Sequence, residues 1–123
     1  MSGSRVALVT GGAVRVGRAI SSALAEDGYR LVIHYNSSSG PADELVQEIR
    51  AKGGDAVAIG ADLADAQAVR RLAREAVDAF GGIDVLVNNA SIFPSERLEE
   101  TDEELWDHTL AVNLRAPFFL IRH

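Results

Sequence analysis

Four short apolar runs alternate along the chain with longer stretches in which apolar residues recur at helical spacing. The runs at 5–10, 31–35, 56–59 and 83–87 have the composition of buried parallel strands. The helical pattern is clearest after the third run, where the apolar side chains are Val69, Leu72, Ala73, Ala76, Val77 and Phe80. This spacing predicts an amphipathic helix. Similar stripes predict helices at about 16–27 and from residue 41 up to the glycines at 53–54.

Turn-forming residues mark where these elements begin and end. Gly28 and the glycine pairs at 53–54 and 81–82 follow the three helical stretches, at places where a left-handed residue commonly ends a helix. Pro41 is predicted at the first position of the second helix, because proline fits there without losing a hydrogen bond. Asp65 is predicted as the N-cap of the third helix.

A last helical segment toward residue 123 is predicted by the capping-box pair Thr101 and Glu104. Its apolar face would consist of Trp106, Leu110 and Leu114. The resulting order, βαβαβαβα with short connections, requires parallel strands, right-handed crossovers and helices on both faces of one sheet. We therefore predict an α/β fold with a doubly wound parallel sheet.

Composition narrows the class of protein. A length of 123 residues, with 47% hydrophobic and 24% charged residues, is typical of one soluble globular domain. The net charge of −6 disfavours nucleic acid and anionic membranes as partners. Without cysteine or a histidine pair at metal-ligand spacing, no metal site is expected. Because no apolar run is long enough for a signal peptide or a membrane span, we expect a cytoplasmic protein.

The segment 10–17 joins the first predicted strand to the first predicted helix and reads T-G-x-x-x-R-x-G. Gly11 permits a tight turn, Gly17 allows close packing of the helix against the sheet, and the helix-start N–H groups would face a pyrophosphate. A tight turn without a ligand is the alternative. Arg15 stands where a middle glycine is expected. Its planar cation can pair with a phosphate or stack on a flat heterocycle, and the alternative is a solvated surface arginine.

This segment resembles the T-G-x-x-x-G-x-G signature of the short-chain dehydrogenase/reductase family. Further stretches of that family occur in the same order, namely Asp62-Leu63, the run 88–90 (Asn-Asn-Ala) and Asn113. The resemblance covers essentially the whole chain and the N-terminal half of such enzymes. It implies the N-terminal part of an NADP-binding Rossmann-type domain over 1–123, with strand order 3-2-1-4 and the nucleotide at the carboxyl edge of the sheet.

Within the family, the chain is similar to the pteridine reductase branch at 15–18, at 34–35 and at 89–93. That similarity implies that Arg15 contacts both the cofactor and a pterin, and that Ser91 and Phe93 lie at the substrate. A flat substrate can stack on an aromatic ring. A place for Phe93 in the ordinary core is the alternative.

The end of the second predicted strand, 34–39, contains no carboxylate. An acid there would bind the ribose 2′-hydroxyl and repel a 2′-phosphate, so NADP(H) is favoured over NAD. Serines acting only as turn formers are the alternative, and Ser37 departs from the arginine that the resemblance gives for many pteridine reductases. The predicted cofactor-binding residues are Gly11, Arg15, Val16, Gly17, His34, Tyr35, Asn36, Ser37, Ser38, Asp62, Leu63, Asn89 and Ala90.

The catalytic pair of the family, Tyr-x-x-x-Lys, is absent from these residues. Neither Tyr29 nor Tyr35 has a lysine four positions later, and Lys52 is the only lysine. The proton donor is therefore expected beyond the end of the chain. The resemblance implies one catalytic residue here, Asn113, for which a polar residue tolerated in a helix is the alternative.

These observations predict an NADP-dependent reductase that transfers hydride to a pterin-like C=N or a C=O group of a small-molecule substrate. A ketone or 3-ketoacyl reductase of the same family is the alternative within enzymes. A non-catalytic NADP-binding module and a structural fragment that binds no nucleotide are the alternatives outside them. The resemblance also implies a homo-oligomer, either a dimer or a tetramer, for the intact protein.

Overall fold

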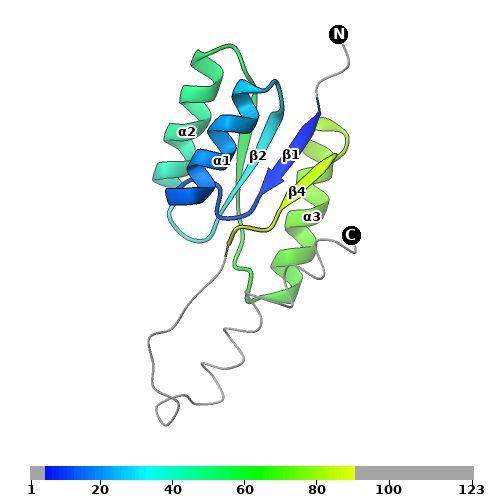
Figure 1. Cartoon of the computed structure of the whole chain (residues 1–123). Coiled ribbons are helices and arrows are strands. Elements are labelled where there is room, and N and C mark those ends of the chain that lie inside the picture. The colour runs from blue at the N-terminus through cyan, green and yellow to red at the C-terminus, as the bar shows by residue number, and fades with distance from the viewer. Residues whose placement is uncertain (1–4, 91–123) are drawn as a thin grey trace.

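The computed structural model of the chain describes residues 5–90, which form four strands and three helices (Figure 1). The last predicted helical segment and the residues Ser91, Phe93 and Asn113 lie outside the described residues. The elements, in chain order, are β1 (Val6–Val9), α1 (Arg15–Glu26), β2 (Arg30–Tyr35), α2 (Ser39–Ala51), β3 (Ala56–Gly60), α3 (Ala66–Phe80) and β4 (Val85–Val87).

The four strands form one parallel sheet in the order β3-β2-β1-β4, which confirms the predicted order. In the registers of the three strand pairs, Val9 lies beside Ile33 and Val87, and Tyr35 lies beside Gly60. All the strands therefore end at the same edge. In such a sheet the loops after two adjacent strands lead to opposite sides at the point where the strand order reverses, which leaves a crevice for a ligand. That point lies here between β1 and β4.

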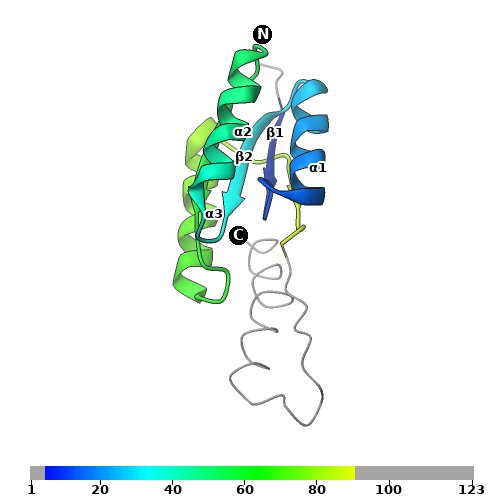
Figure 2. The same ribbon diagram turned by 90° about the vertical axis from the view of Figure 1, so that its left-hand side faces the viewer.

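Helices cover both faces of the sheet, and Figure 2 shows α1 and α3 on opposite sides of it. Successive residues of a strand point to opposite faces. Val6 and Leu8 accordingly belong to the core under α3, whereas Ala7 and Val9 belong to the core under α1 and α2. Because both faces are buried, the strands need apolar residues at every position, which explains the continuous apolar runs of the sequence.

The predicted helix ends are confirmed at four positions. Gly28, Gly53 and Gly81 have φ values of +93°, +90° and +84°, in the left-handed region that costs glycine little. Asp65 caps α3, since its Oδ1 accepts a hydrogen bond from the Gln67 N–H at 2.9 Å.

The prediction for Pro41 is wrong, because α2 begins at Ser39 and places the proline at its third position. The first turn of a helix has no internal acceptor for its N–H groups, so proline costs no hydrogen bond there either. The other differences concern bounds. β4 begins at Val85, two residues later than predicted. β1 is one residue shorter at each end than the apolar run 5–10.

Candidate functional site

A cleft of about 630 Å³ lies at the carboxyl edge of the sheet, beside the β1–α1 turn, the β2–α2 loop, the β3–α3 loop and the residues after β4. The structure brings all the predicted cofactor-binding residues within 5–90 to this cleft. Ala13, Val14 and Pro41 line it as well. The predicted substrate residues Ser91 and Phe93 and the predicted catalytic Asn113 lie outside the described residues.

The β1–α1 turn is held by hydrogen bonds to the neighbouring strand β2. Gly11 has a φ of +60°, and its N–H donates to Nδ1 of His34 at 3.0 Å. The Gly12 N–H donates to the His34 carbonyl at 3.1 Å, and the buried Ser21 hydroxyl donates to the Gly12 carbonyl at 2.8 Å. These contacts fix the path of the backbone between the strand and the helix.

The end of β4 is tied to the same turn by Thr10 and Asn89. The buried Thr10 hydroxyl accepts the N–H groups of Asn89 and Ala90 at 3.0 and 3.1 Å. In return, the Asn89 side-chain amide donates to the carbonyls of Thr10 and Gly11 at 3.2 and 3.1 Å. Asn89 therefore supports the turn from the side opposite to β2, and its contacts explain why an amide suits this position.

Gly17 allows the first turn of α1 to lie directly against this support. A Cβ at residue 17 would overlap the Gly11 carbonyl and lie 2.5 Å from Nδ2 of Asn89. The predicted close packing is confirmed, but the partner is the turn itself rather than the face of the sheet. A side chain at this position would push the helix N-terminus away from the cleft.

Arg15 is exposed and has a φ of +53°, so it occupies the left-handed region with a side chain. This conformation costs a residue with a Cβ about 1–2 kcal/mol, which explains why a glycine is expected here. Its guanidinium has no hydrogen bond or ion pair with any other residue between 5 and 90. Arg15 thus adds a positive charge to the lining of the cleft.

The electrostatics of the cleft favour an anion. The N-cap of α1 is Val14, and neither α1 nor α2 has a capping hydrogen bond from its N-cap side chain or an acidic residue in its first turn. Uncapped N–H groups and the helix dipole both attract negative charge. Asp62 is the one carboxylate among the described residues that line the cleft. Its Oδ1 already accepts the Ala64 N–H at 2.9 Å.

The remaining cleft residues differ in burial. Asn36, Ser37 and Ser38 are exposed in the β2–α2 loop, where their amide and hydroxyl groups can donate hydrogen bonds to a ligand. Leu63 is buried and packs in the core under α3. The half-buried Tyr35 ring lies over Gly60, where a Cβ would come within 2.7 Å of the ring.

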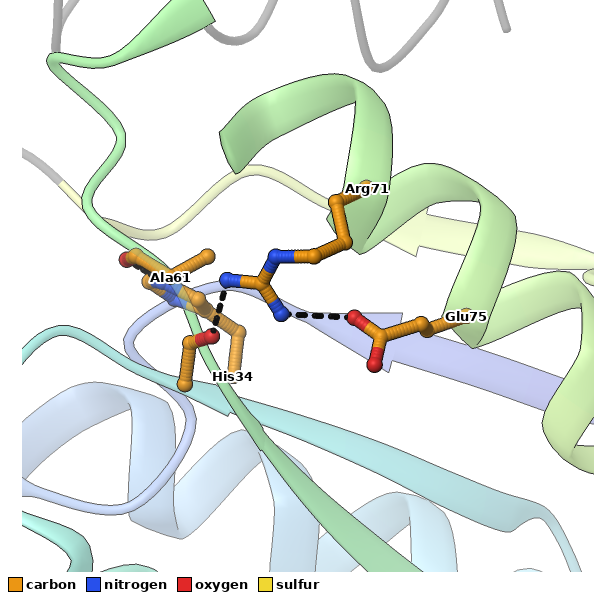
Figure 3. Close-up of polar contacts among 5 residues, drawn as sticks. His34, Ala61, Arg71 and Glu75 are labelled. Atoms are coloured by element: carbon orange, nitrogen blue, oxygen red, sulfur yellow. Dashed lines mark hydrogen bonds and ion pairs between the residues drawn. The ribbon is translucent and has the colours of Figure 1, made fainter. Parts of the chain in front are cut away.

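His34 is placed differently from a ligand-facing residue. Its side chain is 1% exposed, and both ring nitrogens are engaged by backbone groups, Nδ1 by the Gly11 N–H and Nε2 by the Ala61 carbonyl at 2.8 Å. Figure 3 shows the ring against Ala61. Burial lowers the pKa of His34 below 6.5, opposed by the hydrogen bond to Ala61.

The sequence reasoning missed the Thr10 and Ser21 hydroxyls, and it assigned the His34 imidazole to cofactor binding rather than to support of the turn. Each is almost fully buried, and each satisfies a backbone group of the turn or of its neighbours. A polar residue next to the end of an apolar strand was the available signal for Thr10 and His34, because buried polar groups need partners. Nothing in the sequence identified those partners.

Comparison with known proteins identifies the family. The family model for short chain dehydrogenases matches residues 5–123. The chain belongs to the short-chain dehydrogenase family. Among curated relatives, 3-oxoacyl-(acyl-carrier-protein) reductase FabG of Staphylococcus aureus is 42% identical over 122 residues, which cover 99% of this chain and 50% of the relative. The chain thus spans about half the length of the curated relatives it matches.

Two solved structures share the fold with this chain at substantial sequence identity. A blue fluorescent protein from a metagenomic library, in complex with NADPH, is 44% identical with a TM-score of 0.92, over 96% of this chain and 49% of that one. FolM alternative dihydrofolate reductase 1 of Brucella canis, in complex with NADP, is 39% identical with a TM-score of 0.91, over 99% of this chain and 48% of that one. These matches agree with the doubly wound architecture.

Residues 5–90 contain neither a candidate membrane span nor a candidate metal cluster. No helix in this part of the chain has both the length and the apolar character needed to cross a membrane. The same residues contain no group of three or more histidine, cysteine, aspartate or glutamate side chains that could hold a metal ion.

Proposed function

We propose that the chain binds NADP(H) in the cleft and serves as the cofactor-binding part of a reductase. The observation that carries the proposal is one arrangement, in which the uncapped first turn of α1 with Arg15 faces a β2–α2 loop without a carboxylate. Helix N-termini of this kind bind phosphates through their N–H groups and dipole. The NADP and NADPH complexes of the similar structures support the same cofactor.

The preference for NADP(H) over NAD(H) rests on the loop after β2. An acidic residue at this place would accept the ribose 2′-hydroxyl and repel a 2′-phosphate. The exposed residues here are Asn36, Ser37 and Ser38, which we assign to the 2′-phosphate together with Arg15. Asp62 and Leu63 would lie at the adenine ring, and Asn89 and Ala90 would lie along the cofactor after β4.

The proposed reaction is hydride transfer to a small-molecule substrate, and the bound cofactor supplies the hydride. The residues of this chain hold and orient the cofactor, and the proposed substrate contacts are Arg15, Ser91 and Phe93, with Asn113 in the proton path. We propose a pterin-like C=N group as the acceptor. The exposed Arg15 guanidinium beside the cleft and the 39% identity to FolM alternative dihydrofolate reductase 1 support this choice.

A 3-oxoacyl or other ketone substrate is the second candidate. The 42% identity to the Staphylococcus aureus 3-oxoacyl reductase favours it. Titration of the NADP-loaded chain with 7,8-dihydrofolate and with a 3-ketoacyl thioester separates the two, because each candidate requires saturable binding of its own ligand. We further propose a cytoplasmic homo-oligomer, for which sedimentation equilibrium gives the subunit number.

Calorimetric titration with NADPH and NADH tests the cofactor assignment. We expect NADPH to bind at least tenfold more tightly than NADH. Arg15→Ala should weaken NADPH binding about tenfold, because a hydrogen bond to a charged group is worth about 1.5 kcal/mol or more. Arg74→Ala removes an equal charge from the exposed face of α3, away from the cleft, and should leave the affinity unchanged. An absence of saturable NADPH binding refutes the proposal.

A further inference from the structure

One side chain at the centre of the carboxyl edge connects two parts of the cleft that lie far apart in the sequence. The His34 ring ends the buried part of β2 and touches both neighbouring backbones. Its Nδ1 is 3.0 Å from the Gly11 nitrogen in the β1–α1 turn, and its Nε2 is 2.8 Å from the Ala61 oxygen after β3. The imidazole thus spans the gap between the turn and the segment that leads to Asp62.

The protonation state of the ring follows from these partners. A backbone N–H can only donate, so Nδ1 of His34 must carry a lone pair toward Gly11. A carbonyl can only accept, so Nε2 must carry the proton toward Ala61. The geometry therefore requires the neutral ring with its proton on Nε2. Either the other tautomer or the imidazolium would break at least one of the two contacts.

The segment after β3 is held from a second side as well. Arg71 of α3 donates from Nη2 to the Gly60 carbonyl at 3.0 Å, and its Nη1 pairs with Glu75 at 2.6 Å (Figure 3). The carbonyls of Gly60 and Ala61 are therefore both fixed by side chains. The ring of His34 therefore links Gly11 to a segment that α3 also contacts.

We propose that His34 is a positioning residue for the cofactor. It fixes the position of the β1–α1 turn without touching the ligand. Its Nδ1 lone pair holds the Gly11 N–H, and with it the left-handed turn ahead of α1, while Nε2 anchors the ring to the β3 end. This inference rests on the proposed function, since the affinity that it predicts is for NADP(H).

Three substitutions separate the two contacts. In His34→Asn, the amide oxygen can occupy the place of Nδ1 and accept the Gly11 N–H, but the side chain is too short to reach Ala61. In His34→Gln, the longer amide can donate to Ala61 but loses the acceptor beside Gly11. His34→Leu removes both contacts. We expect the Kd for NADPH to rise at least tenfold in His34→Gln and His34→Leu, and less than threefold in His34→Asn.

The outcomes distinguish this inference from the proposed function. If the unchanged chain does not bind NADPH, the proposed function fails and the positioning role fails with it. If the unchanged chain binds and the Asn and Gln variants bind equally well, only the positioning role is overturned. A residue that merely supports the fold would lower the thermal midpoint of every variant without this rescue by asparagine.

A spectroscopic measurement tests the same inference without any substitution in the measured protein. Long-range ¹H–¹⁵N spectra of the imidazoles distinguish the two neutral tautomers and the imidazolium. The chain has three histidines, so the signals that remain in a His108→Gln/His123→Gln double variant assign those of His34. We expect the Nε2–H tautomer at pH 7, both with and without NADPH. If the Asn and Gln variants do not fold, this spectrum decides, and an Nδ1–H tautomer or an imidazolium overturns the proposal.

Discussion

Replacement of Gly17 by alanine should destabilise the fold and the cofactor site together. The added Cβ would overlap the Gly11 carbonyl and lie 2.5 Å from Nδ2 of Asn89. Inserting a methyl group into such a contact costs about 1–3 kcal/mol. If the Asn89 amide moves away, its two hydrogen bonds to the turn are lost at about 1 kcal/mol each. Alanine regains about 1 kcal/mol through helix propensity, so we expect a net loss of about 2–4 kcal/mol.

Urea unfolding followed by circular dichroism measures this loss. With a slope of about 2 kcal/mol/M, a loss of about 3 kcal/mol lowers the midpoint by about 1.5 M. Gly40→Ala is the matched control, because Gly40 lies in the first turn of α2 with no atom within 4 Å of an added Cβ. That variant should gain about 0.5 kcal/mol. Equal midpoint shifts in the two variants would refute the close approach of α1 to the turn.

Three other predictions follow from the cleft and its support. Ser37→Asp should lower the NADPH/NADH affinity ratio about tenfold in paired titrations, because a carboxylate repels the 2′-phosphate. Gln47→Asp adds the same charge at an exposed position of α2 and should not change this ratio. Arg15→Gly should raise the urea midpoint by relieving about 1 kcal/mol of left-handed strain while weakening NADPH binding, and a lowered midpoint would contradict the strain. Because burial lowers the pKa of His34 from 6.5, the unfolded chain binds this proton more tightly. The contribution of His34 to the free energy of unfolding should therefore be constant above about pH 6.5 and fall as the pH drops toward the folded pKa. His34→Asn should remove this contribution and reduce the slope.

The cofactor cleft shows which parts of the site were visible in the sequence. Gly11, Arg15 and Gly17 could be assigned to one turn because they are close in the chain and lie between a strand and a helix. The serines after β2 could be placed by the same local argument. The support could not, since Thr10 meets Asn89 across 79 positions and His34 meets Ala61 across 27. Such pairs depend on which strands become neighbours.

Burial also changed the meaning of individual residues. His34 and Tyr35 are adjacent and were assigned the same role, yet the His34 side chain is enclosed at the end of β2 and the Tyr35 side chain is half-buried over Gly60. The two side chains point to opposite faces of the strand, as the two-residue period of a strand requires. Pro41 shows a similar limit, because the sequence indicated a helix start but did not fix its position within the first turn.

The sequence by itself determined the alternation of strands and helices and the parallel sheet, because these depend on local periodicity. It also determined that the helices end at glycines, because few other residues favour the left-handed backbone conformation. Tertiary structure alone decided which polar side chains are exposed in the cleft and which hold the backbone of the β1–α1 turn. The reason is physical: the hydrogen-bond partners of Thr10, His34 and Asn89 are backbone groups. Every residue but proline offers the same N–H and C=O groups, so only their positions in space can select them.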